Sequence, residues 1–205
     1  MGIGAKIALG VVGAIVLIVI IFGATVAGTY NSLVSLDQGA QSQWAQVENV
    51  YQRRADLVPN LVATVKGAAN FEQSTLIAVT EARAKVGQVT SGAIENIARD
   101  PQAFARFQQA QDGLSSALSR LMVVAERYPD LKATQNFREL QSQLEGTENR
   151  ITVERMRFNE TAQAFNTKRD TFPTVLIAGL FGSKFQEKPY FKAVTGAEKA
   201  PEVKF

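Results

Sequence analysis

The sequence predicts an all-α protein in which an N-terminal transmembrane helix leads into an antiparallel bundle of long helices, of the four-helix type. An uncharged apolar run lies near the start of the chain, and apolar residues then recur every seven positions through most of the remainder. No segment alternates between apolar and polar residues as a half-buried strand would. We therefore expect a short flank (residues 1–6), a transmembrane helix (7–27), a helical bundle (28–172) and a C-terminal tail (173–205).

The first helix is predicted from residues 7–27, which contain no charged residue and no proline. At about 1.5 Å per residue, this run spans roughly 31 Å, which matches the hydrocarbon core of a bilayer. A cleaved signal peptide is the alternative, but the run is longer than the apolar region of a typical signal, which has about 7–15 residues. We therefore expect a retained anchor in the lipid bilayer.

Charges on either side of the anchor predict its orientation. Lys6 precedes the apolar run, and neither lysine nor arginine follows it until Arg53. The positive-inside rule therefore favours a cytoplasmic N-terminus and a bundle outside the cytoplasm. Within the anchor, small residues stand four apart, which would let anchors of several copies pack closely, although such pairs are also ordinary in apolar helices. These pairs are Gly10 with Ala14 and Gly23 with Ala27.

A stripe with a period of 3.5 to 3.6 residues follows the anchor and predicts a long helix that packs along its length. Its positions are Leu33, Leu36, Ala40, Trp44, Val47, Tyr51, Arg54, Val58, Leu61 and Val65. No strong helix breaker separates Ala27 from this stripe, so we expect the anchor to continue into it as a rigid stalk. Pro59 lies inside the pattern and is expected to kink the helix or to mark a local break.

The next segments are less regular. Residues 67–70 predict a turn, and Asn70 with Gln73 resembles a capping box that opens a helix over residues 71–86. Residues 87–99 contain Gly, Ser and Thr with little periodicity, which predicts a linker. Asp100 followed by Pro101 then indicates the start of another helix, because Asp is a good N-cap and Pro suits the first helical position.

Two further helices follow. The first carries Phe107, Leu114, Leu121 and Tyr128 at intervals of seven and should end near Tyr128, because Pro129 disfavours helix in the residue before it. The second begins near Thr134, ends before Pro173 and has an apolar seam at Phe137, Leu144, Ile151, Phe158 and Phe165. The positions between are mostly polar, so this seam is narrow, as in a coiled coil or an exposed bundle helix.

The tail differs from the helices before it. Its apolar run, residues 175–181, is too short to span a bilayer. Packing on the bundle is the expected arrangement, and an interfacial helix or a partner-binding segment is the alternative. Phe181, Tyr190 and Phe191, which stand among lysines, are the candidate residues for contact with a membrane surface or a partner.

Composition excludes several classes of function. The chain has no histidine and no cysteine, so it has no imidazole base, thiol nucleophile, zinc ribbon, iron–sulfur cluster or disulfide. The net charge is +3, and the basic residues are scattered among acids rather than gathered into a nucleic-acid-binding patch. We therefore predict no catalytic residue, no cofactor, no metal ligand and no nucleic-acid partner.

Arg54 is the most informative candidate residue, because it lies on the apolar stripe and a buried guanidinium must be paired or reach water. The favoured interpretation is an internal salt bridge to an acid such as Glu148, which would fix which helices pair. An interaction site formed with Arg53 and Asp56 is the alternative. Trp44, the only tryptophan, is expected in the core rather than in a ligand platform.

Charged residues also gather within three turns of the last long helix. They are Glu145, Glu148, Arg150, Glu154 and Arg155. Two carboxylates three residues apart are the starting point for a metal site or a carboxylate hydrolase. The neighbouring arginines keep such acids ionised, however, and no histidine completes a metal motif. An ion-paired helix surface, with Arg150 and Glu148 as candidate interaction residues, is therefore expected.

Several segments, in order along nearly the whole chain after the anchor, resemble the LemA family of bacterial membrane proteins. They are residues 30–34 (YNSLV), 52–62 (QRRADLVPNLV), 65–67 (VKG), 80–83 (TEAR), 128–133 (YPDLKA), 144–151 (LEGTENRI) and 190–191 (YF). Phe158–Asn159 and Phe165–Asn166 depart from the Tyr-Asn of relatives. The resemblance implies an anchored helical bundle in the bacterial inner membrane, and it supplies no catalytic residue, substrate or reaction.

These observations together predict a membrane-anchored, non-enzymatic scaffold or interaction protein. We expect it to self-associate through its helix seams and its anchor, and to bind another, unidentified membrane or envelope protein. A membrane-remodelling or lipid-organising protein that uses the C-terminal apolar segment is the alternative. A hydrolase that relies on Glu145 and Glu148 alone is the third interpretation.

Overall fold

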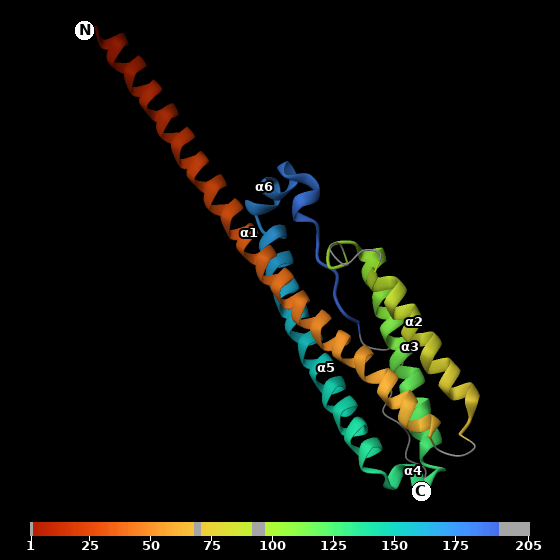
Figure 1. Cartoon of the computed structure of the whole chain (residues 1–205). Coiled ribbons are helices and arrows are strands. Elements are labelled where there is room, and N and C mark those ends of the chain that lie inside the picture. Colours follow the sequence, from red (N-terminus) through yellow and green to blue (C-terminus); the bar gives the residue numbers. More distant parts are fainter. Residues whose placement is uncertain (1, 68–70, 92–96, 193–205) are drawn as a thin grey trace, which may run out of the picture.

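The computed structural model describes residues 2–67, 71–91 and 97–192. Over these ranges the chain is all-helical, with no strand, as the sequence predicts (Figure 1). The α-helices are α1 (Ile3–Lys66), α2 (Gln73–Ser91), α3 (Pro101–Ala125), α4 (Pro129–Ala133), α5 (Gln135–Asp170) and α6 (Thr174–Leu180). A short 3-10 helix, Gly182–Phe185, follows α6.

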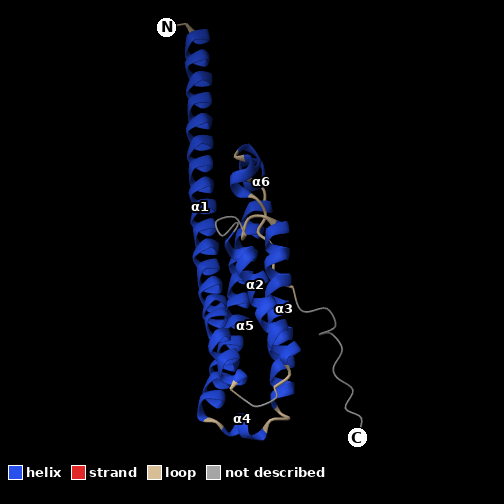
Figure 2. Ribbon diagram, turned by 45° about the vertical axis from the view of Figure 1, so that its right-hand side comes forward, coloured by secondary structure: helices blue, strands red, loops and turns tan. Residues whose placement is uncertain are grey.

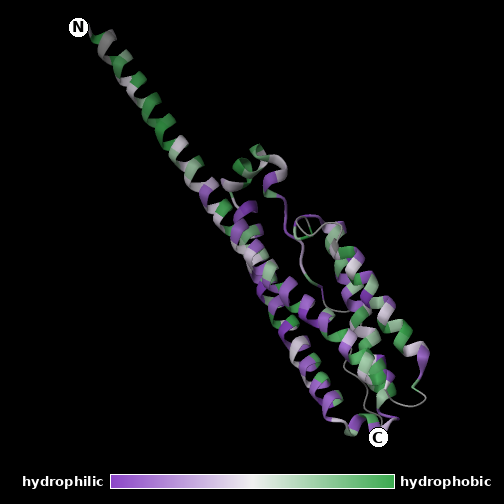
Figure 3. Ribbon diagram, viewed as in Figure 1, coloured by the Kyte–Doolittle hydropathy of each residue, from purple (hydrophilic) through white to green (hydrophobic). Residues whose placement is uncertain are grey.

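The longest element is α1, a single α-helix of 64 residues. Its apolar N-terminal part projects alone beyond the other helices (Figure 3). Among the described residues, this helix is the one that is long and apolar enough to cross a membrane, and its most apolar window has no buried residue. The same helix then enters the bundle without interruption, which confirms that the apolar run continues directly into the first bundle helix.

The bundle is built from two helix pairs, in which α1 packs against α5 and α2 packs against α3 (Figures 1 and 2). Helix α5 runs antiparallel to α1, because Leu33 shares a cluster with Phe165, whereas Arg54, further along α1, meets Glu148. Helix α4 closes the end of the bundle away from the anchor. Helix α6 lies at the opposite end, beside the point where the apolar part of α1 leaves the bundle (Figure 1).

The core consists of three clusters arranged along the bundle. The cluster farthest from the apolar span is mostly aliphatic, the central one is rich in aromatic rings, and the third, nearest the span, is formed by Leu33, Phe165, Ala178 and Phe185. All five residues of the predicted α5 seam are buried in these clusters, together with residues of α1. The seam is therefore covered within the chain.

Local signals placed two helix starts correctly. The Asp100 side chain accepts a hydrogen bond from the backbone N–H of Gln102 at 2.8 Å, and so caps α3. The Thr134 hydroxyl accepts one from the N–H of Phe137 at 3.4 Å, and so caps α5. The predicted cap at Asn70 lies outside the described residues.

The predicted linker over residues 87–99 is wrong at its beginning, because α2 continues to Ser91. Val86 is buried and Val89 packs against the aromatic cluster, so tertiary contacts hold a segment whose composition favours a loop. Ile97 and Ala98, near the end of the same stretch, are also buried. Residues 92–96 lie outside the described ranges.

Pro59 does not break α1, contrary to one of the two outcomes expected for it. A proline inside a helix lacks an N–H, so the carbonyl four residues earlier loses its usual partner. That carbonyl belongs to Ala55, and Nε of Arg83 in α2 donates a hydrogen bond to it at 3.0 Å. The contact with α2 thus replaces the missing helix hydrogen bond.

The tail packs on the bundle over residues 174–192, as expected. Ile177, Ala178 and Phe185 are buried near the anchor end of the bundle, and Phe191 is buried in the aromatic cluster. Residues 193–205 of the tail lie outside the described residues.

Candidate functional site

The predicted ion pair between Arg54 and Glu148 is present. Nη1 of Arg54 lies 2.9 Å from Oε2 of Glu148, and the Arg54 side chain is 1% exposed whereas that of Glu148 is 50% exposed. The guanidinium also donates to the Ser115 hydroxyl at 2.5 Å, and to the backbone carbonyl and side-chain oxygen of Gln111 at 3.1 and 2.5 Å. Arg54 therefore joins α1, α3 and α5 inside the bundle.

The other charged candidates do not join this network. Arg53, Asp56 and Arg150 are exposed, and Asp56 accepts a hydrogen bond from Gln52 on its own helix. Glu145 accepts one from Gln141 at 3.0 Å. The described residues contain no group of three or more acids that could hold a metal ion. The geometry supports internal pairing for Arg54 and a solvated helix surface for these exposed residues. Glu154 and Arg155, predicted on the same surface, are instead partly buried.

Trp44 lies in the aromatic cluster of the core, as expected. Its ring centroid is 5.2 to 6.0 Å from those of four phenylalanines, contributed by α3, α5 and the tail: Phe104, Phe107, Phe158 and Phe191. The indole N–H donates to Glu48 at 2.6 Å. Burial raises the pKa of Glu48, and the hydrogen bond from Trp44 opposes that shift.

A second polar group, partly buried, lies beside this cluster. Nε of Arg155 in α5 donates to the Tyr51 hydroxyl at 2.5 Å, and its Nη2 lies 3.0 Å from the Asp112 carboxylate in α3. Burial raises the pKa of Tyr51 to about 12, although the nearby Arg155 opposes the shift. The Arg155 guanidinium also lies 5.0 Å from the centre of the Phe191 ring. Arg155 thereby links three bundle helices, α1, α3 and α5, to the tail.

Residues 186–192 form an extended segment along α5, which we call the strap. Two asparagines of α5, seven residues apart, bind its backbone in both directions. Asn159 donates to the Phe191 carbonyl at 3.0 Å and accepts from the Phe191 N–H at 2.9 Å. Asn166 does the same for Lys188, at 2.9 and 2.8 Å, and also donates to the Tyr190 hydroxyl.

A buried ion cluster holds the strap against α1. Lys188 is 2% exposed and forms a salt bridge with Asp37, whose side chain is 7% exposed. Arg99, in the segment before α3, also pairs with Asp37, at 2.9 Å. Gln41 donates to the same carboxylate at 2.6 Å. The strap is therefore fastened to α5 by amides and to α1 by charge.

The three tail candidates have different positions. Phe191 is buried, whereas Tyr190 and Phe181 are 37% and 40% exposed. The Tyr190 hydroxyl is held by Asn166, and the Phe181 ring lies 4.8 Å from that of Tyr30, close to the base of the apolar span. The structure thus places Phe181 at the anchor end of the bundle and the other two on the strap.

The sequence of this chain is similar to that of a known protein family. The family model described as the LemA family matches residues 43–205, which is most of the chain. This chain belongs to the LemA family. It is 30% identical to magnetosome protein MamQ 2 of Paramagnetospirillum magneticum over 192 residues, which cover 85% of this chain and 71% of the relative.

Two further relatives are similar to this LemA-family chain over most of its length. MamQ of Magnetospirillum gryphiswaldense is 29% identical over 192 residues, with 85% of this chain and 71% of the relative covered. Protein LemA of Metamycoplasma hominis is 26% identical over 158 residues, with 77% and 67% covered.

The segments that suggested the LemA family contain several of the tertiary contacts described above. Segment 52–62 contains Arg54 and Pro59, segment 144–151 contains Glu148, and segment 80–83 contains Arg83. The motifs therefore include partners that meet across helices. Of these contacts, only the pairing of Arg54 with Glu148 followed from the sequence alone.

Sequence reasoning missed the ion cluster and the asparagine contacts. A signal for Asp37 was present, since it stands four residues after Leu33 and three before Ala40, on the edge of the apolar stripe of this LemA-family chain. Asn159 and Asn166 each follow a seam phenylalanine, so they adjoin the buried face. No local pattern indicated that their partners would be the backbone of the strap.

Proposed function

We propose that this LemA-family chain is a membrane-anchored, non-enzymatic helical scaffold that self-associates and presents its bundle to another membrane or envelope protein. The observation that carries the proposal is the continuity of α1, whose 64 residues extend about 96 Å at 1.5 Å per residue. A continuous helix transmits the height and tilt of the membrane span to the bundle. This arrangement suits the display of a binding surface at a fixed distance from the bilayer.

The charged residues of the described chain support recognition rather than bond-making. The buried charges Asp37, Arg54 and Lys188 are engaged in structural pairs, as is the partly buried Arg155. The names of the three relatives, two MamQ magnetosome proteins and a LemA protein, are not those of enzymes. We place the anchor in the bacterial inner membrane with the bundle outside the cytoplasm, because Lys6 precedes the span.

Self-association is proposed to run through the anchor. The α5 seam is covered by α1 and the tail of the same chain, whereas the apolar span projects without a neighbour. No side chain lies within 4 Å of the Cβ position at Gly10 or Gly23. These glycines stand 13 residues apart, which at 100° per residue places their faces about 140° apart. Two separate packing faces suit a cluster of several anchors better than a symmetric pair.

The test is disulfide crosslinking in membranes, which the chain permits because it has no native cysteine. Single-cysteine chains, with the cysteine introduced in the span at Ile7, are oxidised in vesicles, and the crosslinked fraction is read on gels. Gly10→Leu and Gly23→Leu should each reduce crosslinking, and the double variant should reduce it further. Ala8→Leu adds the same kind of bulk away from both small-residue pairs and serves as the matched control.

Other outcomes would contradict self-association through the anchor. Crosslinking that is unaffected by both glycine substitutions would place any contact elsewhere. A strictly monomeric mass for the full chain in several mild detergents, with no crosslink in vesicles, would remove self-association altogether. A chain recovered from the aqueous fraction rather than from vesicles would overturn the proposed anchoring itself.

A further inference from the structure

Helix α6 is apolar on both of its faces. Thr174, Ile177 and Ala178 are buried against the bundle. The opposite side carries Leu176 and Leu180, which are 63% and 78% exposed. A surface helix in water normally turns polar residues outwards, so this exposed face lacks the composition of a water-exposed surface.

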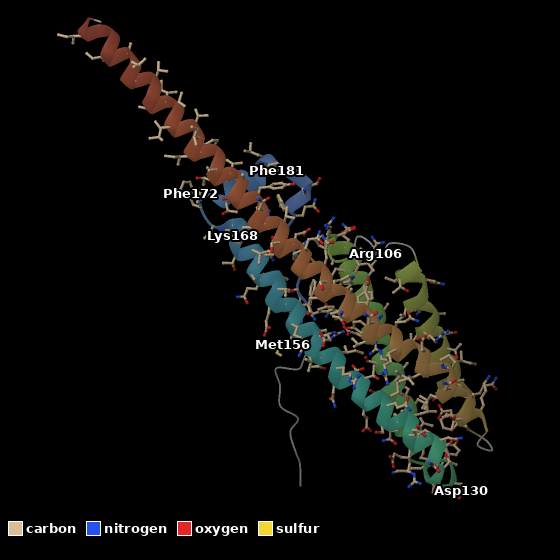
Figure 4. The ribbon with its side chains drawn as sticks, turned by 60° about the vertical axis from the view of Figure 1, so that its left-hand side comes forward. Arg106, Asp130, Met156, Lys168, Phe172 and Phe181 are labelled. Carbon is tan, nitrogen blue, oxygen red and sulfur yellow. The ribbon has the colours of Figure 1, made fainter. Side chains whose placement is uncertain are left out.

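Two aromatic residues extend the apolar face at the ends of α6. Phe172, just before the helix, is 80% exposed, and Phe181, just after it, is 40% exposed. Both lie at the end of the bundle from which the apolar part of α1 projects, whereas Asp130 marks the far end (Figure 4). We call residues 172–181 the foot. Its exposed apolar face is confined to this end of the bundle.

The height of the foot relative to the membrane follows from its contact with α1. The centroid of the Phe181 ring lies 4.8 Å from that of the Tyr30 ring, and the centroid of the Phe185 ring lies 5.6 Å from that of Tyr30. Tyr30 stands three residues after Ala27, the last residue of the apolar span, which corresponds to about 4.5 Å along the helix axis. Phe181 is therefore level with the headgroup region of a bilayer that contains the span.

The charges around the foot suit the same position. Lys184 donates a hydrogen bond to the Tyr30 hydroxyl and is exposed. Lys168 lies at the same end of the bundle (Figure 4). The nearby Asp170 is neutralised by Arg169 at 2.5 Å. Lysines beside tyrosine and phenylalanine are characteristic of the membrane–water interface, where the rings enter the acyl boundary and the ammonium groups meet phosphates.

We propose that the foot docks into the interface of the same bilayer that holds the span, so that the chain contacts the membrane at two places. This inference rests on the proposed anchoring of α1. Since the foot is packed on both α1 and α5, its docking fixes the tilt of the bundle relative to the bilayer. The ligand is the lipid surface itself, with its phosphate headgroups and upper acyl chains.

The proposal is tested by site-specific fluorescence on the full chain, whose lack of native cysteine allows single labels. A cysteine at Leu180, labelled with the environment-sensitive dye NBD, is compared with one at Val123 after reconstitution into phosphatidylcholine–phosphatidylglycerol vesicles. Val123 is the matched control, because it is an exposed apolar residue (70%) near the opposite end of the bundle. Quenching is measured with shallow nitroxide-labelled lipid and with aqueous iodide.

At Leu180 we expect strong quenching by the shallow lipid nitroxide and a several-fold lower iodide quenching constant than at Val123. Equal iodide access at both positions, in a chain that floats with the vesicles, would overturn docking while leaving the anchoring intact. A label shielded from both quenchers would mean that a protein surface covers the foot, and would also overturn the proposal. A chain that fails to float would contradict the anchoring instead.

A second variant guards against a local effect of the label. Leu176→Glu with Leu180→Glu, combined with a label at Phe172, should raise iodide quenching several-fold and abolish quenching by the lipid nitroxide. Unchanged helical circular dichroism would establish that the variant is folded. Unchanged quenching at Phe172 in a folded variant would contradict docking through this face.

Discussion

Arg54 illustrates how single residues determine the helix arrangement. It is buried among three helices, whereas its partner Glu148 is half-exposed. Removing one side chain of this ion pair should therefore lower the free energy of unfolding by a different amount from removing the other. Loss of Glu148 leaves a buried cation with neutral acceptors only, whereas loss of Arg54 leaves a carboxylate that water can reach. The pair is therefore asymmetric, and its coupling can be measured.

We expect Glu148→Gln to lower the free energy of unfolding by about 2 kcal/mol, since the pair is partly screened by solvent. Adding Arg54→Met should recover part of this loss, because no buried charge then lacks its counter-ion. Denaturant unfolding in detergent gives the coupling energy, which should exceed about 1 kcal/mol. The exposed pair Arg127–Glu72 is the control and should couple by less than about 0.5 kcal/mol. Additive effects at Arg54 and Glu148 would contradict this assignment.

Tyr51 predicts a dependence of stability on alkaline pH. Burial raises the pKa of Tyr51 to about 12 from the ordinary value of 10, so the folded chain favours the protonated phenol. The contribution of the protonated Tyr51 phenol to the free energy of unfolding is complete below pH 10. It is lost as the pH rises from 10 towards 12, because the phenol ionises first in the unfolded chain. At the upper end of this range, the stability lost amounts to about 2 to 3 kcal/mol.

The measurement compares the free energy of unfolding of the native chain and of Tyr51→Phe across this window. The native chain should lose stability more steeply, and the difference between the two curves isolates Tyr51 from the lysines, which titrate in both. Parallel curves would show that the phenol ionises in the folded chain as it does in water.

At the scale of elements, α1 tolerates Pro59 because α2 supplies a donor. Nε of Arg83 binds the Ala55 carbonyl that the proline leaves without an amide partner. The two residues depend on each other: Pro59 leaves the Ala55 carbonyl free for Arg83, and Arg83 has this role only while the proline is present. This contact is the reason that α1 stays one helix through the position where a break was expected.

Arg83→Met should therefore destabilise the chain by about 1 kcal/mol, the net value of one hydrogen bond. In a Pro59→Ala background the new amide can bond the Ala55 carbonyl within the helix, so Arg83→Met should become nearly neutral. Thermal unfolding of the four variants in one detergent provides the double-mutant cycle. An equal cost of Arg83→Met in both backgrounds would show that Arg83 acts through something other than this carbonyl.

The strap depends on the two asparagines of α5. Asn166→Ala removes two donated hydrogen bonds and one accepted bond that hold Lys188 and Tyr190. A net loss of roughly 1.4 kcal/mol should open the strap about tenfold more often. Chymotrypsin cleavage after Tyr190 and Phe191 should accelerate accordingly. Asn149→Ala, at an exposed position of the same helix, is the control and should leave the cleavage rate unchanged.

At the scale of the whole molecule, the proposed two membrane contacts depend on the rigidity of the stalk. Span and bundle share one helix, so a change in helix length between them moves the entire bundle. The foot reaches the interface only because it packs beside Tyr30. Height above the bilayer is therefore a property of α1 rather than of α6.

Inserting seven helix-forming residues after Gly28 should raise the bundle by about 10 Å and turn it by only about 20°. The foot would then lie above the headgroups, and a label at Leu180 should become accessible to iodide in a chain that still floats with vesicles. The same seven residues appended after Phe205 control for added length. If the label remains protected, the stalk bends enough for the foot to return to the surface.

The sequence by itself determined the features that depend on local physics. The apolar span, the 3.5-residue period of α1 and α5, the cap at Asp100 and the start of α5 near Thr134 follow from patterns within a few turns. An internal acidic partner for Arg54, with Glu148 as the named example, could also be expected, because a charge on an apolar stripe requires a counter-ion. Apart from this pair, these are the parts of the fold for which neighbouring residues carry the information.

Only the tertiary structure decided the contacts between distant segments. Asp37 and Lys188 are 151 residues apart, and no local rule pairs them. The same holds for the asparagines that bind the strap, for Arg83 at the Ala55 carbonyl, and for the helical extension of α2 to Ser91. The physical reason is that a buried polar group takes whichever partner packing brings within reach, and packing is a property of the whole chain.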